Sequence, residues 1–254
     1  MWQANKTTFA VLLLAAGSAV HAETASTPSL APFVAKYMVE WHGINAGTST
    51  IELIPNGGGR YTYKSGNQAR GLFKLAFPDV IRQSSVLQFD NGVVRPLSFR
   101  ADDGSKDKSR DVSLDFDWAK NRVTGTSEKQ AVSLDLKPGT QDAMSVQLAL
   151  MLELQAGRSP TMFWMADKTE IKDYVYAYDG EATLSTPLGR IPTVIWSSHR
   201  PNSDRLTRIW YAPSLGFAPL QAARTRAGKL EWTMKIQKLD RNAADQARGN
   251  VTPR

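Results

Sequence analysis

Apolar side chains recur at every second position in several stretches of the chain. The clearest stretches are 112–118 (VSLDFDW), 132–136 (VSLDL) and 229–237 (KLEWTMKIQ). Because successive side chains of an extended strand point to opposite faces, each stretch has one apolar face and one wet face. Strands of this kind build antiparallel sheets that are solvated on one side. The alternation therefore predicts a mainly β protein.

Turn-forming residues separate the alternating stretches. Glycine, asparagine and aspartate tolerate positive φ between strands, and they cluster at Asn56–Gly59, Asp90–Gly92, Asp102–Gly104 and Ala227-Gly228. In the second half of the chain, Tyr174, Tyr176 and Tyr178 alternate with smaller residues and so share one face of a strand. The spacing predicts a curved antiparallel meander or partly open barrel of about a dozen strands.

One stretch, about 140–156, breaks the alternation and predicts a helix. Thr140 can cap it, Asp142 in the first turn suits the positive helix end, and Gly157 fits the position after its last turn. Its apolar residues leave no continuous polar face, so we expect the helix to be largely buried inside the curve of the sheet. At about 15 residues it is too short to span a bilayer. A weaker pattern predicts a second helical piece over Gln68–Leu75.

The first 22 residues have the composition of a signal peptide. Met1–Lys6 is mildly basic, Phe9–Val20 is apolar or small, and Val20-His21-Ala22 offers small residues for cleavage after Ala22. The alternative is a membrane anchor, but a spanning helix needs about 20 apolar residues and this run is shorter. The sequence therefore predicts export to the periplasm of a Gram-negative cell.

The rest of the chain divides by composition into three parts. We expect residues 23–32 (ETASTPSLAP) to be a flexible lead-in, 33–240 a single β-rich domain and 241–254 a disordered tail. Cysteine is absent, which excludes a disulfide, a thiolate metal site and a lipid-modified N-terminal cysteine.

The chain is basic. Residues 1–22 contain one lysine and no acidic residue, so their removal lowers the formal net charge from +7 to +6. The basic residues are spread along the chain, and nucleic-acid binding is therefore not expected. Two readings of the charge remain open: contact with an anionic envelope component, including the membrane surface, and plain solubility.

Several short motifs, taken in order, resemble one known family. The chain is similar to the exported proteobacterial proteins called domain of unknown function 3108. The resemblance rests on Tyr37…Gly43…Ala46-Gly47, Gly92…Arg95-Pro96-Leu97, Gln141–Ser145, Leu184–Gly189 with Val194-Ile195-Trp196, and Ile209–Pro213 with Ala218-Pro219-Leu220. It implies a periplasmic antiparallel β architecture. It implies no activity, because the family has none established, and hence no functional residues.

Motifs typical of enzymes and metal sites are missing or incomplete. His42 and His199 have no neighbour at ligand spacing, so we expect both in surface loops. No Gly-x-Ser-x-Gly occurs, and Ser105–Lys108 matches Ser-x-x-Lys only in a charged loop. Gly66–Gly71 lacks the Lys and Ser or Thr of a phosphate loop, and Asp102–Asp107 has its glycine misplaced for calcium. We expect no catalytic residue, no metal and no cofactor.

Aromatic and basic residues of the last strands are the candidate ligand-binding residues. Trp196, Trp210 and Trp232 fall in neighbouring C-terminal strands and can line a cavity for an acyl chain or glycan. Arg208 and Arg224 flank them and can meet an anionic headgroup. The alternatives are an ordinary aromatic core and arginines that keep edge strands soluble.

Two classes of function remain open at this point. The first is a periplasmic binding or carrier protein for a hydrophobic or amphipathic envelope molecule. The second is an interaction or scaffold protein that docks onto another protein or onto peptidoglycan; an enzyme ranks third. A cavity of several hundred Å³ beneath the helix would favour the carrier, by the usual size of ligand sites. The sequence makes no prediction of the oligomeric state.

Overall fold

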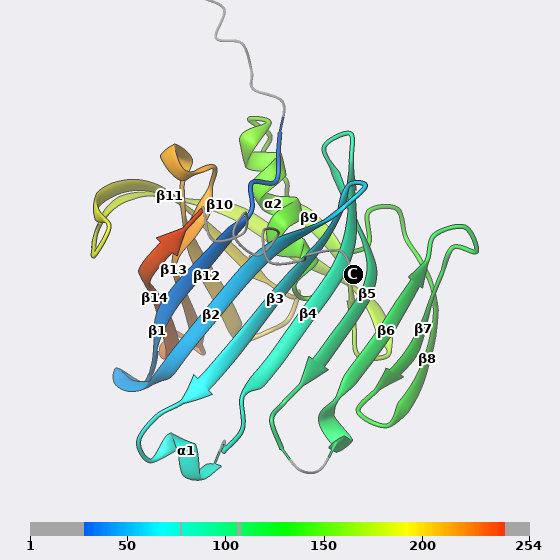
Figure 1. Ribbon diagram of the computed structural model, residues 1–254, viewed down its shortest axis with the longest axis horizontal. Helices are drawn as coiled ribbons and strands as arrows, with labels where there is room; N and C mark the ends of the chain where they lie inside the picture. Colours follow the sequence, from blue (N-terminus) through cyan, green and yellow to red (C-terminus); the bar gives the residue numbers. More distant parts are fainter. Residues whose placement is uncertain (1–27, 77, 106–107, 242–254) are drawn as a thin grey trace, which may run out of the picture.

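A single antiparallel sheet forms most of the molecule (Figure 1). The computed structural model describes residues 28–76, 78–105 and 108–241, so the expected signal peptide and most of the expected tail lie outside the described residues. The sheet contains fourteen strands: β1 (Phe33–Trp41), β2 (Ile44–Gly57), β3 (Arg60–Ala69), β4 (Ile81–Asp90), β5 (Val93–Asp102), β6 (Val112–Asp117), β7 (Arg122–Ser127), β8 (Gln130–Asp135), β9 (Met162–Asp167), β10 (Glu170–Thr186), β11 (Gly189–His199), β12 (Arg205–Ala212), β13 (Ala218–Arg226) and β14 (Lys229–Asp240).

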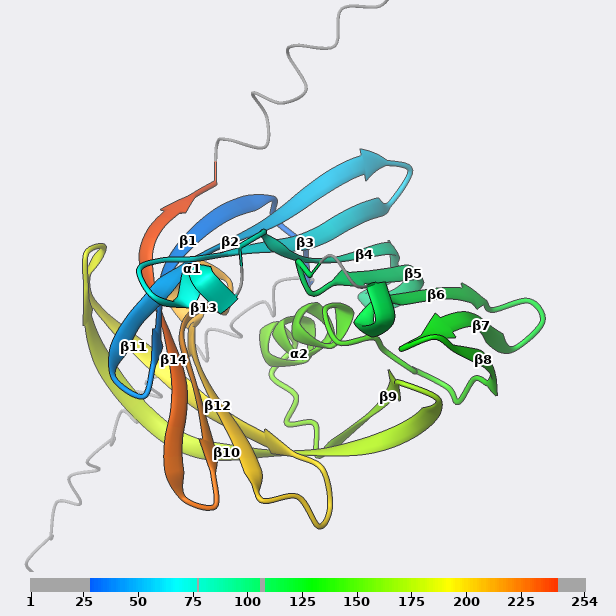
Figure 2. The ribbon, with the colours of Figure 1, turned by 90° about the horizontal axis from the view of Figure 1, so that it is seen from below.

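The strand order shows how two meanders join. Strands β1 to β8 follow one another across one half, β9 to β14 across the other, and β1 pairs with β14 at the centre. The sheet curves around the helix α2 (Ser145–Gln155), and β8 and β9 remain as its two unjoined edges (Figure 2). The prediction of a curved antiparallel meander or partly open barrel is therefore confirmed, with fourteen strands where about a dozen were expected.

The two edges are linked without a shared ladder. The backbone of Gln141, which precedes α2, accepts a hydrogen bond from Ala166 N–H and donates one to the Trp164 carbonyl, both on β9. At the other end of the gap, Lys168 Nζ lies 3.0 Å from a carboxylate oxygen of Glu128, which follows β7. These contacts close the curve of the sheet without making a complete barrel.

The start of α2 differs from the sequence prediction. Asp142 caps the helix, because its Oδ1 accepts hydrogen bonds from the N–H groups of Met144 and Ser145, each at 2.8 Å. Ser145 Oγ accepts in return from Asp142 N–H at 2.9 Å, which completes a capping box. The predicted cap, Thr140, instead donates its hydroxyl to the Lys137 carbonyl within a turn. The turn that Asp142 caps leads into the regular helix, which begins at Ser145, five residues later than the predicted start at about 140.

The end of α2 agrees with the prediction. Gly157 has φ of +68°, and its N–H donates to the Leu154 carbonyl. The N–H of Arg158 donates to the Glu153 carbonyl at 2.9 Å. This pair of hydrogen bonds is a Schellman motif, and it satisfies carbonyls that the last turn would leave open.

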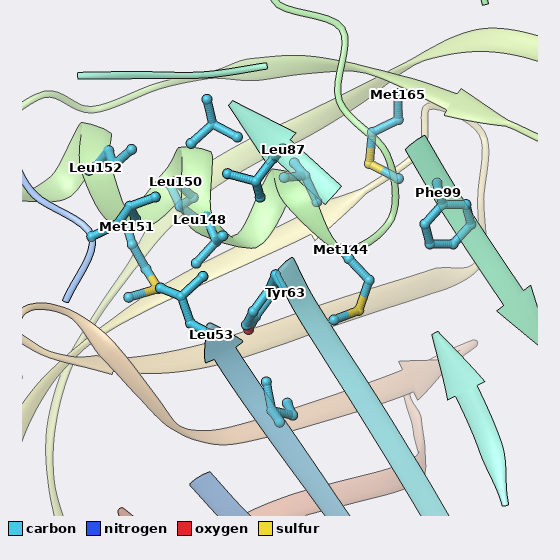
Figure 3. Close-up of a cluster of buried hydrophobic side chains, with 14 of the residues drawn as sticks. Leu53, Tyr63, Leu87, Phe99, Met144, Leu148, Leu150, Met151, Leu152 and Met165 are labelled. Atoms are coloured by element: carbon cyan, nitrogen blue, oxygen red, sulfur yellow. The ribbon is translucent and has the colours of Figure 1, made fainter. Parts of the chain in front are cut away.

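The core lies between α2 and the concave face of the sheet. Leu148, Leu150 and Leu152 are at most 2% exposed and pack over strand residues such as Leu53 and Leu87 (Figure 3). A helix that is apolar on most sides is stable only when it is covered on most sides, and the curved sheet provides that cover. The predicted burial of the helix is thus confirmed.

The structure differs from the sequence prediction in the segment 68–75 and at the end of the expected lead-in. The predicted helical piece at Gln68–Leu75 is wrong for its first part, because Gln68 pairs with Thr48 and β3 continues to Ala69; the helix α1 covers only Phe73–Ala76. Within the expected lead-in, Leu30 is buried and Ser29 N–H donates to Gln155 on α2. The end of that segment is therefore packed on the helix.

Candidate functional site

A cavity of about 700 Å³ lies beyond the N-terminal end of α2. Its wall is mostly hydrocarbon. It comes largely from the sheet, with Val39, Ile51, Ala69, Trp232 and Met234 among the lining residues, and Phe73 of α1 also lines it. We call it the apolar cavity. Its volume falls within the roughly 300–1,000 Å³ that is usual for small-molecule sites.

One polar group in this wall has no partner. Ser49 on β2 is 1% exposed, and its Oγ makes no hydrogen bond to the protein. A buried hydroxyl without a partner costs free energy, so such groups are uncommon in folded proteins. The apolar cavity therefore offers one unused hydrogen-bonding group on an otherwise apolar strand face.

A second cavity, of about 660 Å³, has a different lining. Five cationic side chains face it, from Lys168, Lys172, Arg200, Arg205 and Arg224, against the two carboxylates of Asp167 and Glu128. We call it the basic cavity. Its excess of positive charge favours an anionic occupant.

Part of that charge is held by internal contacts. Asp167 lies 3.5 Å from both Lys172 Nζ and Arg200 Nη1, and the Tyr174 hydroxyl donates to the same carboxylate at 3.1 Å. Burial, followed by the charge of Asp167, raises the pKa of Tyr174 to about 12, so the phenol stays protonated as a donor at neutral pH. Lys172 and Arg200 are therefore oriented by Asp167 and partly neutralised by it.

The two cavities adjoin each other. Both are lined by Gln83, Ala143, Gln147 and Ile209, so the two cavities meet at these side chains. Gln147 projects from the first turn of α2, and its Nε2 donates to the hydroxyl of the fully buried Tyr211. The beginning of α2 thus stands at the junction of an apolar and a basic compartment.

Arg224 and Trp232 connect the compartments from the sheet side. They are direct cross-strand partners on β13 and β14; Arg224 lines the basic cavity and Trp232 the apolar one. The guanidinium carbon lies 5.2 Å from the indole ring centre, and Arg224 Nε donates to Thr207 Oγ1 at 3.3 Å. Burial lowers the pKa of Arg224, although a guanidinium stays charged. Among the described residues no carboxylate forms an ion pair with it.

The remaining predicted ligand-binding residues lie elsewhere. Trp196 is 5% exposed and packs edge-to-face on Tyr178, so it belongs to the core. Trp210 pairs with Ile195 and alternates with cavity-lining Ile209, which puts it on the opposite, convex face of the sheet. Arg208 shares that face and forms an ion pair with Asp179. The structure therefore brings together two of the five, Arg224 and Trp232.

The structure also places the two histidines and the aspartates near the predicted turn at 102–104. His42 is in the exposed β1–β2 turn as predicted, whereas His199 ends β11 and lines the basic cavity instead of lying in a loop. The carboxylates of Asp102, Asp103 and Asp111 lie within 4.8 Å of one another between β5 and β6. Arg110 Nη1 lies 3.9 Å from Asp103, which places a cation beside this cluster.

Sequence reasoning missed most of the basic cavity. The tyrosine alternation was a usable signal, because Tyr174 and Tyr176 both line it. Lys168, Lys172 and Arg200 gave no signal, because they meet through the pairing of β10 with β9 and β11, whose register the sequence does not show. Phe99, Ala101 and Glu128 complete the cavity from the other half of the sheet.

Within the part of the chain that the structure describes, no helix has the length and apolar character needed to cross a membrane. Residues 36–235 match the family described as "Protein of unknown function (DUF3108)". No curated protein matches the chain significantly.

Solved structures share the architecture at low identity. A β-barrel-like protein of the DUF1849 family from Brucella abortus is 15% identical, with a TM-score of 0.53 over 83% of this chain and 98% of that one. The chain is also similar to a protein in the MucA/MucB complex of Pseudomonas aeruginosa, with 13% identity and a TM-score of 0.38 over 85% of this chain and 53% of that one. The first likeness supports the β-barrel-like fold, and neither assigns an activity.

Proposed function

We propose a function for this chain, which belongs to the DUF3108 family of proteins of unknown function, from its two adjoining cavities. It acts as a non-catalytic binding or carrier protein for an amphipathic molecule of the cell envelope. The observation that carries this proposal is the pair of compartments of about 700 and 660 Å³ that meet at the first turn of α2. The predicted signal peptide favours the periplasm as the location of this function.

The division of the cavities suits a ligand with two unlike ends. An alkyl chain would lie against Ile51, Trp232 and Met234 in the apolar cavity, and each methylene removed from water contributes roughly 0.8 kcal/mol. An anionic head would lie in the basic cavity, where the Arg224 guanidinium forms no ion pair with a carboxylate among the described residues and Glu231 acts on it only from a greater distance. Charge-assisted hydrogen bonds to such a head add both strength and orientation.

The contacts of Asp167, a carboxylate of the basic cavity, support a non-catalytic role. Asp167 is occupied by Lys172, Arg200 and Tyr174, which leaves it poorly placed to act as a base. A general base must reach the proton that it abstracts, whereas these contacts only hold cations in place.

The proposal can be tested by filling the apolar cavity. Ala222 is buried in its wall, facing Ile209 and Met234, whereas the next residue, Ala223, pairs with Arg208 on the convex face. We expect Ala222→Phe to weaken binding of the fluorescent fatty acid cis-parinaric acid by about tenfold or more, because the ring displaces two or three methylenes. The measurement is a fluorescence titration of the mature protein.

Ala223→Phe is the matched control, because it adds the same ring to the same strand on the other face. It should bind the fatty acid as the unchanged protein does. Native mass spectrometry of gently purified periplasmic protein should also show a lipid-sized adduct. Bare protein that binds no fatty acid would refute the carrier and favour an envelope protein that docks onto another macromolecule.

A further inference from the structure

Large apolar side chains are exposed on three neighbouring loops of the sheet. Leu72, which precedes α1, is 83% exposed, and Leu75, within α1, is 84% exposed. Ile44, at the start of β2 after the β1–β2 turn, is 63% exposed. Trp41 and Leu230 are less exposed, at 39% and 43%. We call these five residues the apolar tip. Single exposed leucines are ordinary, but a group of this size marks an interaction surface.

The ladder pairings place these loops next to one another. Trp41 on β1 pairs with Ile44 on one side and with Trp232 on the other, and Leu230 lies two residues from Trp232. Arg70 N–H donates to the Ala46 carbonyl at 2.9 Å, which fixes the start of the α1 loop beside β2. Figure 1 shows α1 and the β1–β2 turn at the same lower end of the molecule, away from the C-terminal end of α2.

The apolar tip adjoins the apolar cavity. Trp41 belongs to the tip and also lines the cavity. Phe73, which lies in the sequence between the exposed Leu72 and Leu75, lines the cavity as well. Hydrocarbon surface therefore continues from the tip into the interior.

Basic residues accompany the apolar tip. Arg70, Lys74 and Lys229 are all exposed, and none forms an ion pair with a carboxylate among the described residues. The acids in the same segments are Glu40, Asp79 and Glu231, and Glu40 already forms an ion pair with Lys235 at 2.8 Å. Arg82 adds a further exposed cation close to Asp79, so positive charge is in excess. An apolar group ringed by lysine and arginine matches a lipid surface with anionic headgroups better than it matches water.

We propose that the apolar tip docks this protein onto an anionic phospholipid surface, with Leu72 and Leu75 entering the headgroup layer. Arg70, Lys74 and Lys229 then contact lipid phosphates. In this position the end of the apolar cavity that Trp41 and Phe73 line faces the membrane. The docking needs no occupied cavity, so it stands apart from the proposed binding function.

The test is co-sedimentation of the mature protein with vesicles of phosphatidylglycerol and phosphatidylethanolamine. We expect binding that weakens as salt is raised, and that is much weaker with phosphatidylcholine alone. The double variant Leu72→Ser/Leu75→Ser should lower the partition coefficient about tenfold or more, because two exposed leucines lose their place in the lipid. Both side chains are exposed, so the variant should melt as the unchanged protein does.

The matched control is Val93→Ser/Leu188→Ser, which removes exposed apolar side chains from two other hairpins, β4–β5 and β10–β11. It should bind vesicles as the unchanged protein does.

Two results would overturn the docking proposal: a Leu72/Leu75 variant that binds vesicles as well as the unchanged protein, or an unchanged protein that does not bind vesicles. Either result would leave the tip as a protein-docking surface. Fatty-acid titration of the same variants separates the two proposals, because neither Leu72 nor Leu75 lines the apolar cavity. A Leu72/Leu75 variant that loses vesicle binding but still binds fatty acid supports the docking proposal. An unchanged protein that binds vesicles but no fatty acid refutes only the carrier proposal.

Discussion

The middle of α2 and the residues around its start face the same sheet but meet different surroundings. Leu148 and Leu152 are almost completely covered, whereas Ala143 and Gln147 border two cavities of several hundred Å³. Strand β2 shows the same change along its length, since Leu53 is sealed in the core and Ser49 lines the apolar cavity. The packed region therefore holds the sheet in its curve, whereas the hollow region leaves space for the ligand that we propose.

Leu148→Asp should produce the largest effect, in the packed region. The new carboxylate would be buried among leucines with no partner, which costs several kcal/mol against a total stability on the order of 10 kcal/mol. We expect insoluble or degraded protein. A variant that melts within a few degrees of the unchanged protein would show that the helix is not part of the core.

Asp142 should make the packed region sensitive to pH. Burial raises the pKa of this carboxyl from 3.8 to about 6 despite its hydrogen bonds to Ser85, Ser145 and Met144. The folded state therefore retains a proton that the unfolded chain loses, so this stabilisation is full below pH 3.8 and is lost as the pH rises through 6. A shift of two pKa units corresponds to about 3 kcal/mol.

Asp142→Asn provides the measurement, because the amide keeps the capping oxygen and has no charge. Urea unfolding of both proteins should show the unchanged protein losing stability relative to Asp142→Asn between about pH 4 and pH 6. A difference that stays constant over this range would contradict the raised pKa.

Substitution of two buried serines, one in each region, should change the unfolding free energy by a smaller amount. Ser85 Oγ donates to Asp142 Oδ2 at 2.6 Å, whereas Ser49 Oγ has no partner. We expect Ser85→Ala to cost about 1–3 kcal/mol in unfolding free energy, because it removes a donor from a buried carboxyl. Ser49→Ala should be neutral or slightly stabilising in ligand-free protein. Equal losses in calorimetry would mean that Ser49 is bonded and that the apolar cavity is not hollow there.

The sequence predicted the packed region better than the hollow one. Strand alternation and the apolar sequence of 140–156 are local patterns, and they were sufficient for the antiparallel sheet and the buried helix. The helix start was missed because the choice between Thr140 and Asp142 depends on the Lys137 turn and on Ser85 in β4. A capping residue that is stabilised by a distant strand leaves no local signal.

The candidate site was only partly predictable for a similar reason. Choosing tryptophans and arginines by composition selected Trp232 and Arg224, but also Trp210 and Arg208, which lie on the convex face. Which face a residue occupies depends on the register of β12, including the irregularity between Trp210 and Tyr211. The basic cavity depends further on how far the sheet curls, which no single strand encodes.

The most direct test of the central claim compares an anionic ligand with its neutral analogue. Palmitic acid and its methyl ester would be titrated by calorimetry into the unchanged protein, Arg224→Gln and Arg208→Gln. We expect the acid to bind about tenfold or more tightly than the ester, because one charge-assisted contact is worth roughly 1.5–3 kcal/mol. This preference should shrink markedly in Arg224→Gln and persist in Arg208→Gln. An undiminished preference for the acid in Arg224→Gln, or an unchanged protein that binds neither compound, would show that the two cavities do not hold an amphipathic anion as proposed.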